Sequence, residues 1–251
     1  MILLLDIGNT NTHLGLGDSK RIRRHADMPT SSWGDKNGKK RLKQFVRNAS
    51  LEGAMLCSVV PGATTVATRT IKQLWKFPCL KLTPATLKGI GIDYPKPQTI
   101  GPDRLANAVS LRHHFGQPSV AVDFGTAVIF DVVNRFGKYV GGIIAPGLAA
   151  MTEYLHEKTA LLPQIKIRET KSVIGRSTEE AINVAAVHGY RGLVRTLLQE
   201  IKRELGTKRL PVVATGGYAK LMAARVTEIT AVEPLLTLEG IRLVWHAHHR
   251  G

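Results

Sequence analysis

Short apolar runs recur along this chain, and each is followed closely by glycine, proline or an acidic residue. Such runs, closed by turn residues, predict strands. In the first half they cover Ile2–Leu5, His13–Leu16, Arg21–Met28, Ala54–Val60 and Leu80–Leu82. Helices are predicted over Lys36–Asn48, where Ser31-Ser32-Trp33 could form the cap, over Ala63–Trp75 and over Leu105–His114. The segment Gly89–Ile100, rich in glycine and proline, is expected to be a loop that places Pro102 in a first helical turn.

The second half repeats this plan. Strands are predicted over Val120–Phe124, Ala127–Val133, Tyr139–Ala145 and Leu210–Ala214. Helices are predicted over Leu148–Thr159, over Thr178–Leu205 as one helix or a pair, after Gly217, and over Leu236–Ala247. Two units of meander plus helices predict an α/β protein with two ribonuclease-H-like domains, each a mixed sheet flanked by helices. We expect the domains to cover residues 1–115 and 116–251.

Two matching strand ends suggest where the chemistry lies. Asp6-Ile-Gly8-Asn-Thr10 follows the first strand, and Asp123-Phe-Gly125-Thr126 follows the first strand of the second half. The carboxylates could hold a cation, and the glycines let backbone N–H groups approach a phosphate. A strand-end aspartate is otherwise a turn former. The repeat predicts a duplicated domain with a nucleotide in the cleft between the halves.

Composition narrows the class of protein. The chain has 251 residues, 43% of them hydrophobic and 22% charged, as in globular proteins, and no apolar run long enough to span a membrane. No basic region precedes the first apolar run, so we expect no signal peptide, and two cysteines are too few for a disulfide framework. The cytoplasm is the expected location.

The net charge of +16 is unusual, and half of the excess lies between Lys20 and Arg47. A solvated basic face is the simpler interpretation, and a surface for nucleic acid or another anion is the alternative. No aromatic residues alternate with the basic ones, so nucleic acid is not expected as a partner. The histidines at His113-His114 and near the C-terminus are expected to be solvated rather than metal-binding.

Six motifs occur in a characteristic order: Asp6-Ile-Gly-Asn-Thr-Asn-Thr12, Gly101-Pro-Asp-Arg104, Asp123-Phe-Gly-Thr-Ala127, Gly141-Gly-Ile-Ile-Ala-Pro-Gly147, Ile174-Gly-x-x-Thr178 and Ala214-Thr-Gly-Gly217. Together they resemble the type III pantothenate kinases, members of the acetate and sugar kinase/actin-like ATPase superfamily. The resemblance implies ATP-dependent phosphorylation of pantothenate, the first step towards coenzyme A. It also implies Mg²⁺ with ATP, a monovalent cation (K⁺ or NH₄⁺) and a homodimer.

Asp103 is the candidate catalytic base. A carboxylate beside Arg104 is expected to stay ionised and able to take a proton, although an aspartate here could instead cap the helix. Arg104 can bind a carboxylate through two hydrogen bonds, and pantothenate carries a carboxylate; the alternative is that Arg104 forms a surface salt bridge. The resemblance adds Tyr94, Gly101 and Pro102 as substrate residues, and Thr178 as a contact to the substrate of the neighbouring subunit.

For the nucleotide, the resemblance implies that Asp6 orients Mg²⁺-ATP through water and that Asp123 binds the monovalent cation. The expected ATP-binding residues are Asp6, Ile7, Gly8, Asn9, Thr10, Asn11, Thr12 and His13 in the first loop, with Gly125, Thr126, Gly216 and Gly217 in the second half. Val128 and Ile129 stand where the second phosphate loop usually has threonines, which could weaken ATP binding. Lys96 precedes Pro97 where asparagine is common.

Two other functions remain open at this point. The same scaffold could serve a non-catalytic regulator that uses the basic 20–47 segment to bind a partner or nucleic acid. Intact Asp6, Asp103, Arg104 and Asp123 speak against it. A kinase acting on a sugar is disfavoured by Tyr94 and by the Gly101–Arg104 motif.

Overall fold

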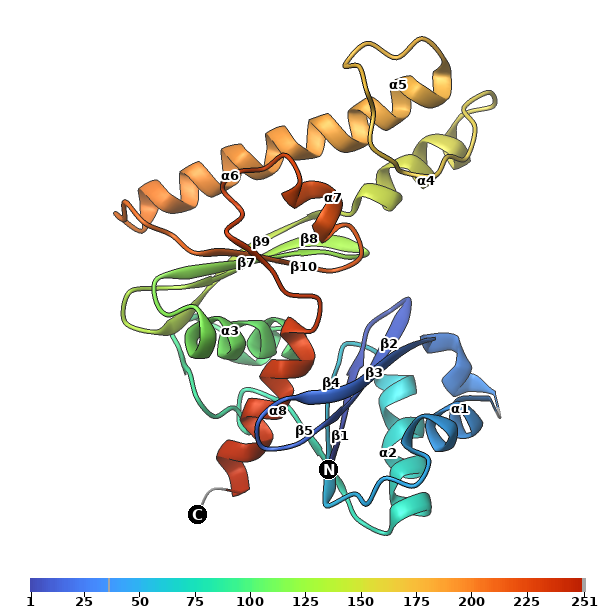
Figure 1. The fold of residues 1–251 in the computed structure, drawn as a ribbon, viewed down its shortest axis with the longest axis vertical. Helices are drawn as coiled ribbons and strands as arrows, with labels where there is room; N and C mark the ends of the chain where they lie inside the picture. Colours follow the sequence, from blue (N-terminus) through green and yellow to red (C-terminus); the bar gives the residue numbers. More distant parts are fainter. Residues whose placement is uncertain (36, 250–251) are drawn as a thin grey trace. The chain divides into compact units, whose positions relative to one another are not determined.

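The computed structural model describes residues 1–35 and 37–249, so the predicted helix start at Lys36 lies outside the described residues. The chain forms two compact units (Figure 1). Unit 1 comprises Met1–His114 and Leu235–Gly251, and unit 2 comprises Phe115–Pro234. The sequence predicts a domain boundary between residues 115 and 116. Leu235–Gly251, however, was expected in the second domain and belongs instead to unit 1.

Unit 1 is built on a five-stranded mixed sheet with the order β3-β2-β1-β4-β5. The strands are β1 (Ile2–Ile7), β2 (Asn11–Gly17), β3 (Ile22–Pro29), β4 (Gly53–Ser58) and β5 (Cys79–Lys81). β1 and β2 pair antiparallel, as do β2 and β3, whereas β4 lies parallel to both β1 and β5. An antiparallel meander extended by parallel strands is the predicted ribonuclease-H-like arrangement.

Helices cover both faces of this sheet. Leu3, Leu5 and Ile7 of β1 pack in one apolar cluster with residues of α1 (Asn37–Val46) and α2 (Pro61–Trp75) (Figure 1). Between β3 and α1, Thr30–Gly34 forms a 3₁₀ turn that buries Trp33, rather than a helix cap. The segment predicted as a loop, Gly89–Ile100, contains the short strand β6 (Gly91–Ile92) and a 3₁₀ turn at Pro97–Thr99.

On the other face, α8 (Leu236–His249) packs against α3 (Pro102–His114). The two helices approach so closely that a Cβ on Gly240 would lie 1.9 Å from the backbone oxygen of Ala106. Ser110 donates a 2.7 Å hydrogen bond to the carbonyl of Leu236. These contacts explain why the end of the chain joins unit 1.

Unit 2 repeats the strand arrangement of unit 1. Its strands are β7 (Ser119–Phe124), β8 (Ala127–Val133), β9 (Lys138–Pro146), β10 (Val212–Thr215) and β11 (Ala231–Val232), paired in the order β11-β10-β7-β8-β9. β7, β8 and β9 form the antiparallel meander, and β10 and β11 extend it in parallel. The predicted duplication is therefore confirmed, and only β11 was not predicted from the sequence.

The helices of unit 2 are α4 (Leu148–Lys158), α5 (Thr178–Val184), α6 (Tyr190–Glu204) and α7 (Ala219–Ala223). A π-helical turn, Ala185–Gly189, joins α5 to α6, so one helical rod runs from Thr178 to Glu204 (Figure 1). Val194 and Leu198 of α6 and Met222 of α7 pack against the sheet in a single apolar core. No helix among the described residues is long and apolar enough to cross a bilayer.

Candidate active site

The first phosphate loop candidate is a tight turn between β1 and β2. The N–H of Gly8 donates a 3.0 Å hydrogen bond to the carbonyl of Asn11, which closes the turn. Asn9, Thr10 and Asn11 are exposed at its tip. The loop therefore presents polar groups and backbone to solvent, as a phosphate-binding loop requires.

Residues outside the motif hold this turn in place. Thr30 donates from its hydroxyl to the carbonyl of Gly8 at 2.7 Å, and its N–H donates to the carbonyl of Thr10 at 2.9 Å. The Trp33 indole donates to the hydroxyl of Thr12 at 3.0 Å. Thr12 is fully buried, so its side chain braces the loop and is not exposed to a ligand. Sequence reasoning missed Thr30 and Trp33, because their approach to the loop depends on the β2–β3 pairing.

Two carboxylates of unit 1 lie close enough to influence each other. Asp6 is the penultimate residue of β1, and Asp103 lies in the first turn of α3. Burial raises the pKa of Asp6 from 3.8 to about 6, and the charge of Asp103 adds to the rise, while His13 opposes it. The thiol of Cys57 donates to Asp6 Oδ1 at 3.2 Å, because Cys57 is the register partner of Asp6 on β4. Sequence reasoning missed Cys57, although it is near the end of a predicted strand.

Asp103 is held by the start of its own helix. The N–H of Arg104 donates to Asp103 Oδ1 at 2.9 Å, and a Cβ on Gly101 would lie only 2.4 Å from that oxygen. Glycine at 101 therefore makes room for the carboxylate. Burial raises the pKa of Asp103, and Arg104 only partly offsets it. The sequence argument, which placed Arg104 first, underestimated this burial.

The other candidate residues of unit 1 lie near Asp6 or Asp103, either in the sequence or in the sheet. Pro102 begins α3 as predicted, and Arg104 and Tyr94 are half-buried. His13 lies opposite Asp6 in the β1–β2 register, and its Nδ1 lies 2.7 Å from Asp27 Oδ1. Unit 1 therefore brings together a polar loop, two carboxylates and a guanidinium.

Unit 2 carries a second loop of the same kind. Asp123 and Thr215 are register partners on the parallel strands β7 and β10, so the loops that follow both strands leave the same edge of the sheet. Gly216 has φ of +86°, and a Cβ there would lie 2.4 Å from Asp123 Oδ1. A Cβ on Gly125 would lie 3.4 Å from the same Asp123 oxygen. Two glycines thus leave a cradle beside Asp123.

The neighbouring residues of unit 2 differ in their exposure. Thr126, Gly216 and Gly217 are exposed, as ligand contacts would be. Val128, which replaces a threonine of the usual motif, is fully buried in the core of unit 2, so its side chain does not face solvent. Gly147 was not predicted as a site residue, yet a Cβ there would lie 2.3 Å from the carbonyl oxygen of Thr126.

Thr178 is the first residue of α5 and is exposed. The helix cap is the preceding Ser177, whose hydroxyl accepts from the N–H of Glu180 at 3.2 Å. Glu180 Oε2 in turn accepts from the N–H of Arg176 at 2.8 Å. This capping arrangement leaves Thr178 itself open to solvent.

Comparison with known proteins decides the family. The family model for type III pantothenate kinase matches residues 2–200. The chain belongs to the type III pantothenate kinase family. A type III pantothenate kinase from Methylacidiphilum infernorum is 44% identical over 245 residues, with 97% of this chain and 87% of the relative covered. Another, from Akkermansia muciniphila, is 45% identical over 242 residues, covering 96% of each chain.

The fold likeness extends to more distant structures. The crystal structure of a conserved protein described as a Baf family transcriptional activator, from Campylobacter jejuni, matches with a TM-score of 0.63, covering 99% of this chain and 100% of that chain. At 18% identity this match shows the fold alone. Membership in a kinase family implies ATP with a divalent metal and pantothenate as substrate, and nothing in the comparisons supports the regulator alternative.

Proposed function

We propose that this chain transfers the γ-phosphoryl group of ATP to the terminal hydroxyl of pantothenate, which gives 4′-phosphopantothenate and ADP. The observation that carries the proposal is the half-buried carboxylates of Asp6 and Asp103, which lie close enough to raise the pKa of Asp6, in a chain of the type III pantothenate kinase family. Phosphoryl transfer needs little covalent chemistry from a protein. It needs charge neutralisation, alignment of the reactants and a group that takes the hydroxyl proton.

Asp6 is the residue proposed to hold Mg²⁺, through water. The donor set fits this ion, since carboxylate oxygens are hard ligands and Mg²⁺ keeps several of its waters. The raised pKa of Asp6 also fits, because a nearby cation would stabilise the charge that burial disfavours. Bound there, the ion would neutralise charge on the phosphates of ATP.

Asp103 is proposed as the base. As the hydroxyl oxygen of pantothenate bonds to the γ-phosphorus, the bond to the β–γ bridging oxygen breaks and the hydroxyl proton passes to Asp103. A pKa raised by burial brings this carboxyl closer to the working pH, which favours general-base catalysis. Arg104 would pair with the carboxylate of pantothenate, and Tyr94, Gly101 and Pro102 would contact the rest of it.

The two glycine loops are proposed to bind ATP. The first loop, Asp6 to His13, would bind phosphates through the backbone of Gly8 and the exposed tip formed by Asn9, Thr10 and Asn11, while the buried Thr12 holds the loop in place. Gly125 and Thr126 would contact phosphates, and the adenosine would lie against Gly216 and Gly217. The cradle beside Asp123 fits a monovalent cation, K⁺ or NH₄⁺, because it offers a carboxylate free of neighbouring Cβ atoms on two sides.

We also propose a homodimer. Unit 2 exposes large apolar side chains that a second copy could cover: Ile144, Tyr154, Leu161, Val173 and Ile174. Thr178 would then reach the substrate of the neighbouring subunit. Light scattering after size exclusion should give twice the mass of the chain, and a monomer at micromolar concentration would contradict the proposal. A cytoplasmic location follows from the need for ATP and K⁺.

The decisive experiment measures ADP release with pantothenate, Mg²⁺-ATP and K⁺. We expect turnover that requires pantothenate and that falls by about 10²–10⁴-fold in Asp103→Asn. Asp93→Asn is the matched control, since Asp93 is an exposed aspartate in the preceding loop. A folded protein that binds ATP but shows no turnover with pantothenate, in either K⁺ or NH₄⁺, would overturn the proposed function.

A further inference from the structure

A cavity in unit 1, about 620 Å³ in volume, lies outside the proposed active-site residues. Four separate segments line it: the β2–β3 turn at Ser19–Lys20, the loop at Lys88–Gly89, the end of α3 and the C-terminal half of α8. Its size is that of pockets that hold small molecules. None of the residues assigned above to ATP or pantothenate lines it.

The lining of this cavity is strongly cationic. Its basic members are Lys20, Lys88, Arg112, His113, His114, Arg242 and His246. Three of the histidines that the sequence left without a role, His113, His114 and His246, thus line one cavity. Basic residues at the end of α3 also complement its helix dipole, but that explanation does not reach Lys20 or Lys88, which lie on other segments.

The nearby carboxylates neutralise only part of this charge. Glu239, whose side chain is 17% exposed, pairs with Arg242 and with His114. Burial would raise the pKa of Glu239, but the hydrogen bonds from Arg242 and His114 outweigh it and lower that pKa, so the carboxylate is ionised and already engaged. Asp18 is held by the Arg23 side chain and by the N–H groups of Lys20 and Arg21. Lys20, Lys88 and Arg112 remain as positive charges in excess.

The walls of the cavity are fixed by hydrogen bonds between segments. Arg242 is 3% exposed and donates to the carbonyls of Asp18 and Ser19, at 3.2 and 2.8 Å. His246 Nε2 lies 3.0 Å from the same Asp18 carbonyl, and Arg112 donates to the carbonyl of Gly89 at 2.8 Å. The β2–β3 turn and the 88–89 loop are thereby tied to α8 and α3. Cationic side chains held around a concave surface in this way are preorganised to bind an anion, because little ordering is needed when it binds.

We propose that this cavity is a binding site for a phosphorylated small molecule that carries two or more negative charges. Lys20, Lys88 and Arg112 supply the charge-assisted hydrogen bonds, and Val109 and Leu243 supply an apolar floor for the rest of the ligand. The site is separate from the residues proposed for catalysis and therefore does not depend on the proposed function.

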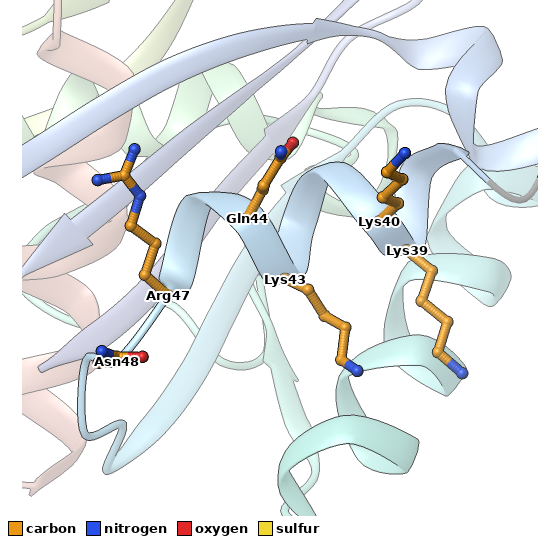
Figure 2. Close-up of a pocket in the computed structure, with 6 residues that line it drawn as sticks. All are labelled: Lys39, Lys40, Lys43, Gln44, Arg47 and Asn48. Carbon is orange, nitrogen blue, oxygen red and sulfur yellow. The ribbon is translucent and has the colours of Figure 1, made fainter.

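A second basic surface of unit 1 serves as the control. It lies on α1 and includes Lys39, Lys43 and Arg47 (Figure 2). Figure 2 shows Lys39 and Lys43 extending from the same side of this helix. Residues of α1 and the adjoining Arg47 and Asn48 line this surface alone, so it lacks the converging segments of the cavity. Removing two lysines here changes the net charge as much as removing two from the cavity.

The test is calorimetric titration of the whole chain with tripolyphosphate in Mg²⁺-free buffer. We expect saturable binding that weakens by about tenfold or more in Lys20→Gln/Lys88→Gln and changes less than twofold in Lys39→Gln/Lys43→Gln. Both pairs of lysines are exposed, so circular dichroism should show both variants folded. Three outcomes would each overturn the proposal. The chain could fail to bind tripolyphosphate, or the two variants could lose affinity equally. The cavity variant could also keep full affinity, which would mean that tripolyphosphate binds elsewhere, as at the phosphate loops.

Discussion

Replacing Asp6 by asparagine is expected to stabilise the metal-free protein while it weakens binding of Mg²⁺-ATP. Burial, with the added charge of Asp103, raises the pKa of Asp6 from 3.8 to about 6. Ionising this group at pH 7 therefore costs the folded state about 3 kcal/mol, since one pKa unit is worth about 1.4 kcal/mol. Asparagine carries no charge, and the thiol hydrogen bond from Cys57 is weak. We expect a gain of up to about 3 kcal/mol in the free energy of unfolding at pH 7.

The gain should have a definite dependence on pH. Because the folded pKa lies above the unfolded one, the folded state binds more protons between about pH 4 and pH 6. The cost of Asp6 therefore grows as the pH rises through that window, and the variant and the natural protein should converge near pH 4. Urea unfolding of both proteins in EDTA, at about pH 4.5, 5.5 and 7, measures how the difference in their free energies of unfolding changes with pH.

Asp93→Asn provides the control for the loss of one carboxylate, because Asp93 is exposed. It should leave the free energy of unfolding within about 0.5 kcal/mol. A loss of stability in Asp6→Asn at pH 7, or a gain that is the same at every pH, would refute the electrostatic reasoning. Added Mg²⁺-ATP should stabilise the natural protein but not the variant.

Three further outcomes follow from the geometry. Gly216→Ala should lower the free energy of unfolding by at least about 1 kcal/mol, because φ is +86° at this position. The new Cβ would also contact Asp123, so activation by K⁺ should fall, and unchanged activation would contradict this reasoning. Gly240→Ala should cost about 1–3 kcal/mol or more in thermal or urea unfolding, because α8 must move away from Ala106. Iodoacetamide at about pH 7.5 should leave Cys57 unmodified in the native protein, because burial raises the pKa of that thiol well above its ordinary value. In urea the reagent should modify Cys57, and mass spectrometry distinguishes the two outcomes.

The sequence by itself determined the local elements, including the strands and turns that carry the proposed site residues. Apolar runs that end at Asp6 and Asp123 become the strands β1 and β7, and the glycines that follow lie in turns. Short-range signals suffice here, since an apolar run and a turn glycine act within a few residues. Pro102 likewise starts α3 where it was predicted.

Only the tertiary structure decided which distant residues meet. The pairing of β4 with β1 brings Cys57 to Asp6, and the β2–β3 hairpin brings the Trp33 indole to the buried hydroxyl of Thr12. The last helix joins unit 1 rather than the unit that precedes it in sequence, because Gly240 lets it pack against α3. Contacts of this kind depend on packing between segments far apart in the chain, and no periodicity within either segment encodes the partner.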